Sequence, residues 1–237
     1  MEQQGVGAPP AGADAAGLLR RLTAEIVDCR KCPRLVAWRE EVGRVKRAAF
    51  RDWTYWAKPV PGFGDPRARV LVVGLAPAAH GGNRTGRIFT GDQSGDWLYR
   101  ALYRAGFASQ PTSAHRDDGL QLRGAYVAAA VRCAPPANRP TPEERDNCLP
   151  YLGREIALLG HVRVFVCLGA FAYDCLGRLL GLRRRPGFRH GLEVPLEDGR
   201  TLLCSFHPSQ QNTFTKRLTE PMFDAVFARA RELADGK

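Results

Sequence analysis

The stretch VLVVGLAPAAHGGNRTGRIFTGDQSGDWL, residues 70–98, decides the fold of this chain. It opens with an unbroken apolar run, stops at Gly74, passes through small residues and ends in a segment with apolar side chains at helical spacing. Such a succession is typical of a parallel strand that is buried on both faces and followed by a helix. The predominance of small residues in the turn after Gly74 indicates that some group comes very close to the main chain there.

The same succession recurs along the chain. Further apolar runs cover about 125–131 and 162–169, and a short strand pair lies around LEVPLEDGRTLLCSF, residues 192–206. The helix after the first strand is predicted to begin with Ser94 as its N-cap, and Thr141 with Glu144 three residues later starts the next one. Further helices are expected at 170–180 and about 220–233, and two more within 17–47.

The order strand, helix, strand, helix, strand, helix, strand predicts a three-layer α/β/α fold. In such a fold the ligand site lies beyond the carboxyl ends of the strands. Three loops are expected to meet at that edge: GLAPAAH after the first strand, CAPPANRP after the second and HPSQQN after the last.

Length and charge restrict the class of protein. The 237 residues suit one domain over residues 17–237, preceded by a flexible tail over 1–16. The net charge of +11 favours a polyanionic partner such as nucleic acid, although an Arg-rich composition alone would also give a basic surface. We expect no membrane segment and no secretory signal, because no long apolar run occurs and the N-terminus lacks a basic start.

The cysteines divide into two sets. Their odd number, seven, in a chain without a signal indicates a reducing cytoplasm. Three of them lie in or near apolar runs and are predicted to be core residues: Cys167, Cys175 and Cys204. The pair Cys29 and Cys32 has CxxC spacing, and Cys133 and Cys148 form a wider pair. Four such thiolates can bind zinc or a [4Fe–4S] cluster, and four unconnected thiols remain the alternative.

Taken together, GLAPAAHGGNRTGRIFTGD, CAPPANRPTPEE, HPSQQN and the cysteine spacing resemble the uracil-DNA glycosylase superfamily, and within it family 5, the B-type iron–sulfur enzymes. The likeness covers about residues 20–233. It implies a central, mainly parallel four-stranded sheet with helices on both sides and a structural [4Fe–4S] cluster held by Cys29, Cys32, Cys133 and Cys148. It also implies a monomeric DNA repair enzyme of the bacterial or archaeal cytoplasm, working at the nucleoid.

The implied activity is hydrolysis of the N-glycosidic bond of uracil and other damaged bases in DNA, leaving an abasic site. The base is flipped out of the duplex into a pocket. By the resemblance, main-chain N–H groups of Gly74, Leu75 and Ala76 bind its edge and Phe89 stacks on it, whereas Phe89 by itself would suit the core. Uracil-specific relatives carry Asn where Ala129 stands here, so we expect a broader enzyme that also removes hypoxanthine.

Three polar residues are the candidates for catalysis. His207 is expected to donate to the base as negative charge develops on it. Family 4 enzymes place Glu after the first glycine, where this chain has Leu75, and the resemblance assigns its task to Asp92, which could orient water or stabilise the cationic sugar. Asn138 is a second polar group near the sugar.

Each of these three residues has a structural alternative. Asp92 could cap the helix at residue 95, Asn138 could bond its own backbone, and His207 could be a structural histidine. Three other histidines lie in no motif and are predicted to be structural or on the surface: His115, His161 and His190.

Contacts to DNA are expected from the loop HPSQQNTFTKR and from a basic loop. Gln210, Gln211 and Asn212 suit the minor groove, and Phe214 could fill the place of the flipped base. Phosphate contacts, which position the protein without reading sequence, are predicted for Lys216, Arg217, Arg183, Arg184, Arg185 and Arg189. The alternative is a solvated charge run.

Competing functions remain. One is an iron–sulfur DNA-binding protein of the same fold that recognises or crosslinks to lesions without excision. Leu75 favours it, and the presence of Asp92, Asn138 and His207 argues against it. Another is a zinc-containing nucleotide-binding module. A nucleotide hydrolase has less support, because the chain has no GxxxxGK[ST] loop.

Overall fold

The computed structural model describes residues 14–182 and 184–236. Residues 1–13 of the predicted tail and Arg183 of the basic loop therefore lie outside the described residues. The first helix, α1, begins at Ala15, two residues earlier than expected. None of the described helices has the length and apolar character needed to span a membrane.

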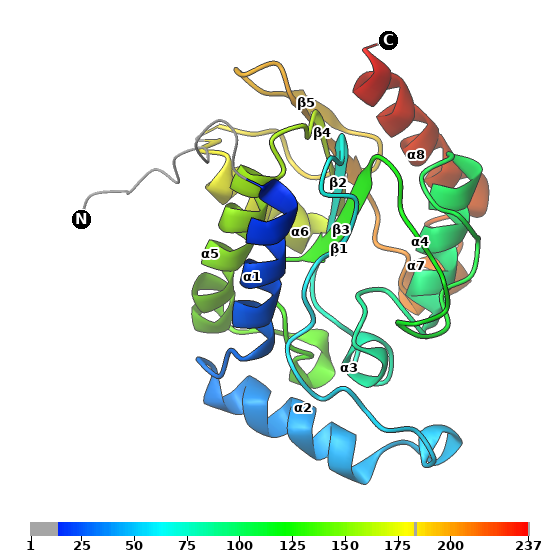
Figure 1. Ribbon diagram of the computed structural model, residues 1–237. Coiled ribbons are helices and arrows are strands. Elements are labelled where there is room, and N and C mark those ends of the chain that lie inside the picture. The colour runs from blue at the N-terminus through cyan, green and yellow to red at the C-terminus, as the bar shows by residue number, and fades with distance from the viewer. Residues whose placement is uncertain (1–13, 183, 237) are drawn as a thin grey trace.

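A six-stranded sheet forms the centre of the molecule (Figure 1), in the order β1-β3-β2-β4-β6-β5. The four inner strands are parallel, and the two short edge strands are antiparallel to their neighbours. The strands are β1 (Phe63–Gly64), β2 (Val70–Gly74), β3 (Ala125–Ala129), β4 (Val164–Leu168), β5 (Glu193–Pro195) and β6 (Thr201–Ser205).

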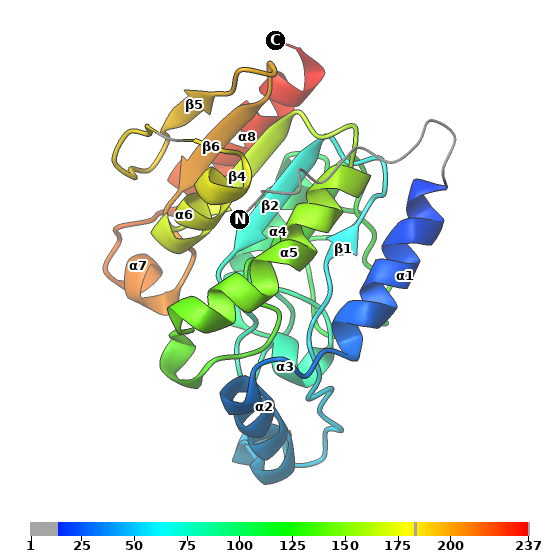
Figure 2. The ribbon, with the colours of Figure 1, turned by 90° about the vertical axis from the view of Figure 1, so that its left-hand side faces the viewer.

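Helices cover both faces of the sheet. They are α1 (Ala15–Val27), α2 (Pro33–Val45), α3 (Gly82–Thr85), α4 (Gln93–Arg104), α5 (Pro142–Leu158), α6 (Ala170–Leu179), α7 (Gln210–Phe214) and α8 (Glu220–Asp235), with 3-10 turns η1 (Ala48–Phe50) and η2 (Pro136–Asn138). Helices α4 and α8 lie on one face and α1, α5 and α6 on the other (Figures 1 and 2). The predicted three-layer α/β/α fold is confirmed.

The pleat of β2 explains why its sequence is an unbroken apolar run. Val70 and Val72 point into the core under α4 and α8, whereas Leu71 and Val73 point into the core under α5 and α6. Successive side chains alternate between faces, and because both faces are covered every position must be apolar. All five residues of β2 are buried.

Local details differ from the sequence predictions at a few points. The four parallel strands are as expected, but β1 extends the sheet with only two residues, too few to give a periodic signal. The N-cap of α4 is Asp92 and not Ser94, because the Asp92 carboxylate accepts a hydrogen bond from the Gly95 N–H. The capping box of Thr141 and Glu144 at the start of α5 is confirmed.

The loops after β2, β3 and β6 meet beyond the carboxyl ends of the strands. Helices α2 and α3 lie past this end of the sheet, at the bottom of Figure 1. Short connections from strand ends to helices thus bring residues far apart in sequence to one edge, as expected for a parallel α/β sheet.

Candidate functional site at the carboxyl edge of the sheet

A cleft of about 630 Å³ opens at this edge. Its walls come from the loop after β2, the start of α4, the η2 turn and the segment after β6. Eight of the residues singled out from the sequence line it: Leu75, Ala76, Phe89, Asp92, Asn138, His207, Gln210 and Gln211. The expectation that the three loops converge is therefore confirmed.

Phe89 is the group that comes closest to the main chain of Gly74. A Cβ added at Gly74 would lie 2.5 Å from Cζ of the Phe89 ring, so no side chain fits there. Phe89 has φ of 51°, a left-handed conformation that is costly for an aromatic residue. Its ring centroid lies 5.7 Å from that of His207, so two rings from distant parts of the chain share one end of the cleft.

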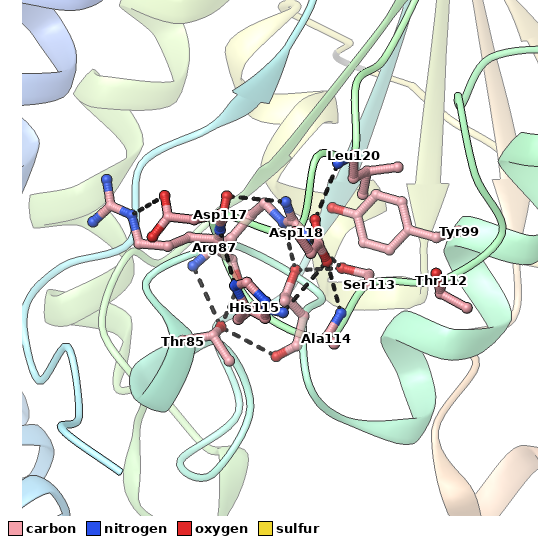
Figure 3. Close-up of polar contacts among 12 residues, drawn as sticks. Thr85, Arg87, Tyr99, Thr112, Ser113, Ala114, His115, Asp117, Asp118 and Leu120 are labelled. Atoms are coloured by element: carbon pink, nitrogen blue, oxygen red, sulfur yellow. Dashed lines mark hydrogen bonds and ion pairs between the residues drawn. The ribbon is translucent and has the colours of Figure 1, made fainter.

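A buried polar network stabilises the strained turn at Phe89. Arg87 donates to Asp118 Oδ2 at 2.7 Å and to Ser113 Oγ at 3.0 Å (Figure 3). It also donates to Thr90 Oγ1 at 3.0 Å. Burial alone would raise the pKa of Asp118, but hydrogen bonds from Arg87 and from main-chain N–H groups lower it to about 2. The carboxylate is therefore ionised at neutral pH. Through Ser113 and Asp118, the loop 112–118 holds Arg87 and Thr90, which lie on either side of Phe89 in the sequence.

Asp92 lines the cleft and caps α4 at the same time. Its Oδ1 accepts from the Gly95 N–H at 2.9 Å, which confirms the capping interpretation. Its Oδ2 lies so close to Gly81 that a Cβ there would be 1.9 Å away. Burial raises the pKa of the Asp92 carboxyl, while hydrogen bonds from the N–H groups of Gly95 and Ser94 counteract part of that rise. The carboxylate is thus held rigidly with little room to move.

His207 follows β6 directly and faces the cleft beside Phe89. Burial lowers its pKa to about 4, so the imidazole is neutral at physiological pH. A neutral imidazole still has one N–H that can donate a hydrogen bond. The side-chain amide of Asn212 donates to the His207 carbonyl at 2.8 Å and so fixes the loop.

Asn138 enters the cleft from the η2 turn. It and Ala137 both have positive φ, 55° and 51°, and Asn is one of the few residues that tolerates this conformation. The side chain is exposed and contacts no described partner through a hydrogen bond. Its amide is therefore available to a molecule in the cleft.

The main chain after β2 presents free donors. The carbonyls of Gly74 and Leu75 accept from the N–H groups of Ala130 and Val131. Among the hydrogen bonds of the described residues, none uses the N–H of Leu75 or Ala76. Ala129 pairs with Gly74 across the sheet but is fully buried and does not line the cleft.

The predicted DNA-binding residues fall into two groups. Gln210 and Gln211 line the cleft, and the exposed Phe214 and Lys216 follow them at and after the end of α7. Gln93 Nε2 donates to Thr213 Oγ1 at 3.1 Å and ties α7 to α4. Asn212 does not line the cleft, because its amide is used within the loop.

The basic loop lies apart from the cleft, and its phosphate contacts stay a prediction. Arg185 forms an ion pair with Asp174 at 2.6 Å and packs along α6, so its charge is neutralised within the protein. Arg184 and Arg189 are exposed. None of these three lines the cleft. Arg217 lies with its guanidinium 4.5 Å from the centre of the Phe206 ring.

The four cysteines of the predicted cluster line one small pocket, between α2, the start of α5 and the segment after β3. Burial raises the pKa of Cys133 to about 12 and of Cys148 to about 11. Within the described residues no three His, Cys, Asp or Glu side chains are close enough to hold one metal ion. The other cysteines, Cys167, Cys175 and Cys204, are buried core residues as predicted.

Sequence reasoning missed several site residues. Gln93, Ser94, Arg139 and Ser209 also line the cleft. His80 lines an adjoining pocket with Asp92 and Asn138, and its Nδ1 lies 3.0 Å from the Tyr55 hydroxyl. His80 stands within the small-residue turn after β2, where a polar ring among Ala and Gly was a usable signal. His190, in contrast, is structural as predicted, with Nδ1 accepting from the Phe206 N–H.

Comparisons with known proteins agree on one family. The family model "Uracil DNA glycosylase superfamily" matches residues 61–231. The chain is 53% identical to a protein named Type-5 uracil-DNA glycosylase from Mycobacterium tuberculosis, over 94% of this chain and 84% of that protein. It is 55% identical to the Type-5 uracil-DNA glycosylase of Thermus thermophilus, over 93% of this chain and 99% of that one. A Type-4 uracil-DNA glycosylase from Archaeoglobus fulgidus is 30% identical over 68% of this chain.

Proposed function

This chain belongs to the uracil-DNA glycosylase superfamily, and from that premise we propose that it hydrolyses the N-glycosidic bond of uracil and of other deaminated bases, hypoxanthine among them, in DNA. The product is an abasic site. One observation carries the proposal: Phe89, Asp92 and His207 meet in one cleft with the free main-chain N–H groups of Leu75 and Ala76. The reaction is inferred from membership of the family and not from the net charge of the chain.

The cleft suits a base that has left the duplex. A flipped base must be stacked and read along its edge. Phe89 supplies a fixed ring, because its strained backbone is clamped by Arg87 and its ring lies against Gly74. The N–H groups of Leu75 and Ala76 supply donors for carbonyl oxygens, which both uracil and hypoxanthine carry.

The bond that breaks leaves positive charge on the sugar and negative charge on the base. His207, neutral because burial lowers its pKa to about 4, donates its N–H to the departing base. Asp92, held by the Gly95 N–H, places a carboxylate where it stabilises the cationic sugar or orients the attacking water. Asn138 reaches the same space from the η2 turn. Fixed groups of this kind need no reorganisation during the reaction.

Broad specificity is supported by what stands next to Gly74. Ala129 pairs with Gly74 in the sheet and offers no amide to read the base. Without an amide at this position, the wrong base leaves no buried group unpaired there, so the pocket discriminates less. Hypoxanthine is larger than uracil, and a cleft of about 630 Å³ has room for it.

Base release from matched duplexes tests this function. Uracil, hypoxanthine and thymine are each placed once in the same sequence, and abasic sites are measured by strand cleavage in alkali. We expect release of uracil and of hypoxanthine. Release of uracil alone would contradict the broad specificity. Tight or covalent binding without abasic sites would favour the non-catalytic or crosslinking alternative.

A [4Fe–4S] cluster fits the four cysteines that surround one pocket. In such a cluster each thiolate binds a different iron, so the sulfurs stand further apart than the ligands of a single ion. When bound, the group would connect α2 to the segment after β3 and act as a structural clamp, held by Cys29, Cys32, Cys133 and Cys148.

Metal content of protein purified without oxygen tests the cluster. We expect about four irons and four sulfides per chain, with visible absorption, and loss of both in Cys133→Ser. Cys175→Ser is the matched control, because Cys175 is buried in the core away from the pocket. Stoichiometric zinc without iron would contradict the proposal.

A further inference from the structure

Arg39 is a buried cation without a carboxylate partner. Its side chain, in the middle of α2, is 1% exposed. Nη1 donates to Cys133 Sγ at 2.9 Å and Nη2 to the Cys29 carbonyl at 3.3 Å. Among the described residues Arg39 forms no ion pair with Asp or Glu, and its Nε has no hydrogen-bond partner.

Two of the other buried arginines do have such partners, whereas Arg84 donates to the carbonyls of His80 and Gly91 and lies over the Phe50 and Trp53 rings. Arg132 pairs with Glu155, and Arg87 pairs with Asp118. Removing a guanidinium from water is strongly unfavourable unless an anion faces it. A neutral thiol is only a weak acceptor, whereas a metal-bound thiolate is an anion. The position of Arg39 therefore suits a negatively charged cysteine centre.

The main chain of Arg39 reaches toward the cleft. Its carbonyl accepts from the side-chain amide of Asn83 at 3.2 Å, and Asn83 is fully buried in α3. The Asn83 N–H in turn donates to the Ala78 carbonyl at 3.1 Å, and Ala78 lines the cleft. Two residues before Asn83 stands Gly81, which touches the Asp92 carboxylate. Helix α2 thus lines the cysteine pocket with Leu35 and Val36 and also packs against α3, which lies next to it in Figure 2.

We propose that Arg39 is a positioning residue that couples the cysteine centre to the catalytic turn. Its guanidinium neutralises the charge at Cys133, and its carbonyl anchors Asn83, which holds the turn that places Asp92. The inference rests on the proposed function and its cluster. In this proposal the cluster influences base release through the contacts of α2 with α3. The reaction itself involves no redox chemistry.

Arg39→Met removes the charge and keeps the size of the side chain. We expect iron to be lost to a chelator roughly 10- to 100-fold faster, the effect of one charge-assisted hydrogen bond. The reduction potential of the bound cluster should become more negative, because a nearby cation favours the reduced form. Arg44→Met, an exposed substitution on the same helix, is the control and should change neither. Should Arg39→Met fail to fold, Arg39→Lys replaces it and should shift both values in the same direction by less.

Asn83→Ala tests the other half of the path. It should lower kcat for base release about tenfold or more with little change in KM, because Asp92 is misplaced. Iron content and reduction potential should stay at wild-type values, since Asn83 does not touch the cysteines. Unchanged kcat in Asn83→Ala, or an unchanged potential and rate of iron loss in the Arg39 variant, would overturn the inference. Wild-type protein without base release or without iron would instead refute the proposed function.

Discussion

Asp92→Asn should lower the rate of uracil release by roughly 10²- to 10⁴-fold, the usual contribution of one catalytic carboxylate. Asn keeps the shape of the side chain, and its oxygen can still accept from the Gly95 N–H as an N-cap. The folded protein should therefore remain stable while the charge near the sugar is lost. Single-turnover release from a uracil-containing duplex measures the effect.

Asp96→Asn is the matched control for this substitution. Asp96 lies in the first turn of the same helix but is exposed and does not line the cleft. Its variant should release uracil at close to the wild-type rate. If Asp92→Asn also stayed within about threefold of wild type, the carboxylate would be only a helix cap.

The pH profile of wild-type release gives a second readout of the same residue. Because burial raises the pKa of Asp92, its carboxylate becomes protonated on acidification at a higher pH than an ordinary aspartate. The rate should fall on the acid side as the charged form is lost, and this fall should vanish in Asp92→Asn. His207 titrates near pH 4 and is already neutral where the assay begins.

Gly81→Ala should reduce uracil release about 100-fold although it adds one methyl group. The new Cβ would lie 1.9 Å from Asp92 Oδ2, so the carboxylate must move, and misplacement by about 1 Å is enough for a loss of this size. Asp92 cannot simply turn away without losing its cap bond to Gly95. The rate of release and the melting temperature of the variant together measure the effect.

Gly160→Ala serves as the control because a Cβ there meets nothing within 4 Å. Its rate and stability should match those of wild type. A Gly81→Ala protein with full activity would show that the carboxylate does not need the position that the structure gives it.

Much of the fold and part of the site followed from the sequence. The apolar runs 70–73, 125–131 and 162–169 became the central strands β2, β3 and β4, and Thr141 with Glu144 began α5 as expected. The loops around Phe89, Asn138 and His207 met at one edge. The strands and the start of α5 depend on neighbouring residues, through side-chain alternation and capping, so local patterns were sufficient for them. The meeting of the loops followed from the parallel order of the strands.

Other features could not be derived in this way. The sequence suggested Ser94 as a cap, but the position of Gly95 relative to Asp92 decided otherwise. Arg185, which is predicted to contact phosphate, forms an ion pair with Asp174 on α6 that no local pattern indicated. Asn212 was expected in the groove and bonds the His207 carbonyl. In each case more than one hydrogen-bond or ion-pair partner was possible from the sequence, and only the folded structure shows which one is used.

The sequence by itself determined the order of strands and helices, the edge where the loops gather and the cysteines that could share a centre. Only the tertiary structure decided which side chains contact Gly74 and Gly81, and which groups surround the Arg39 guanidinium. Those contacts join residues as far apart as Arg39 and Cys133, 94 positions along the chain. Periodicity and capping depend on residues that are close in sequence. Contacts between distant residues form only when the whole core folds, and each buried polar group then bonds to whichever partners lie within hydrogen-bond distance.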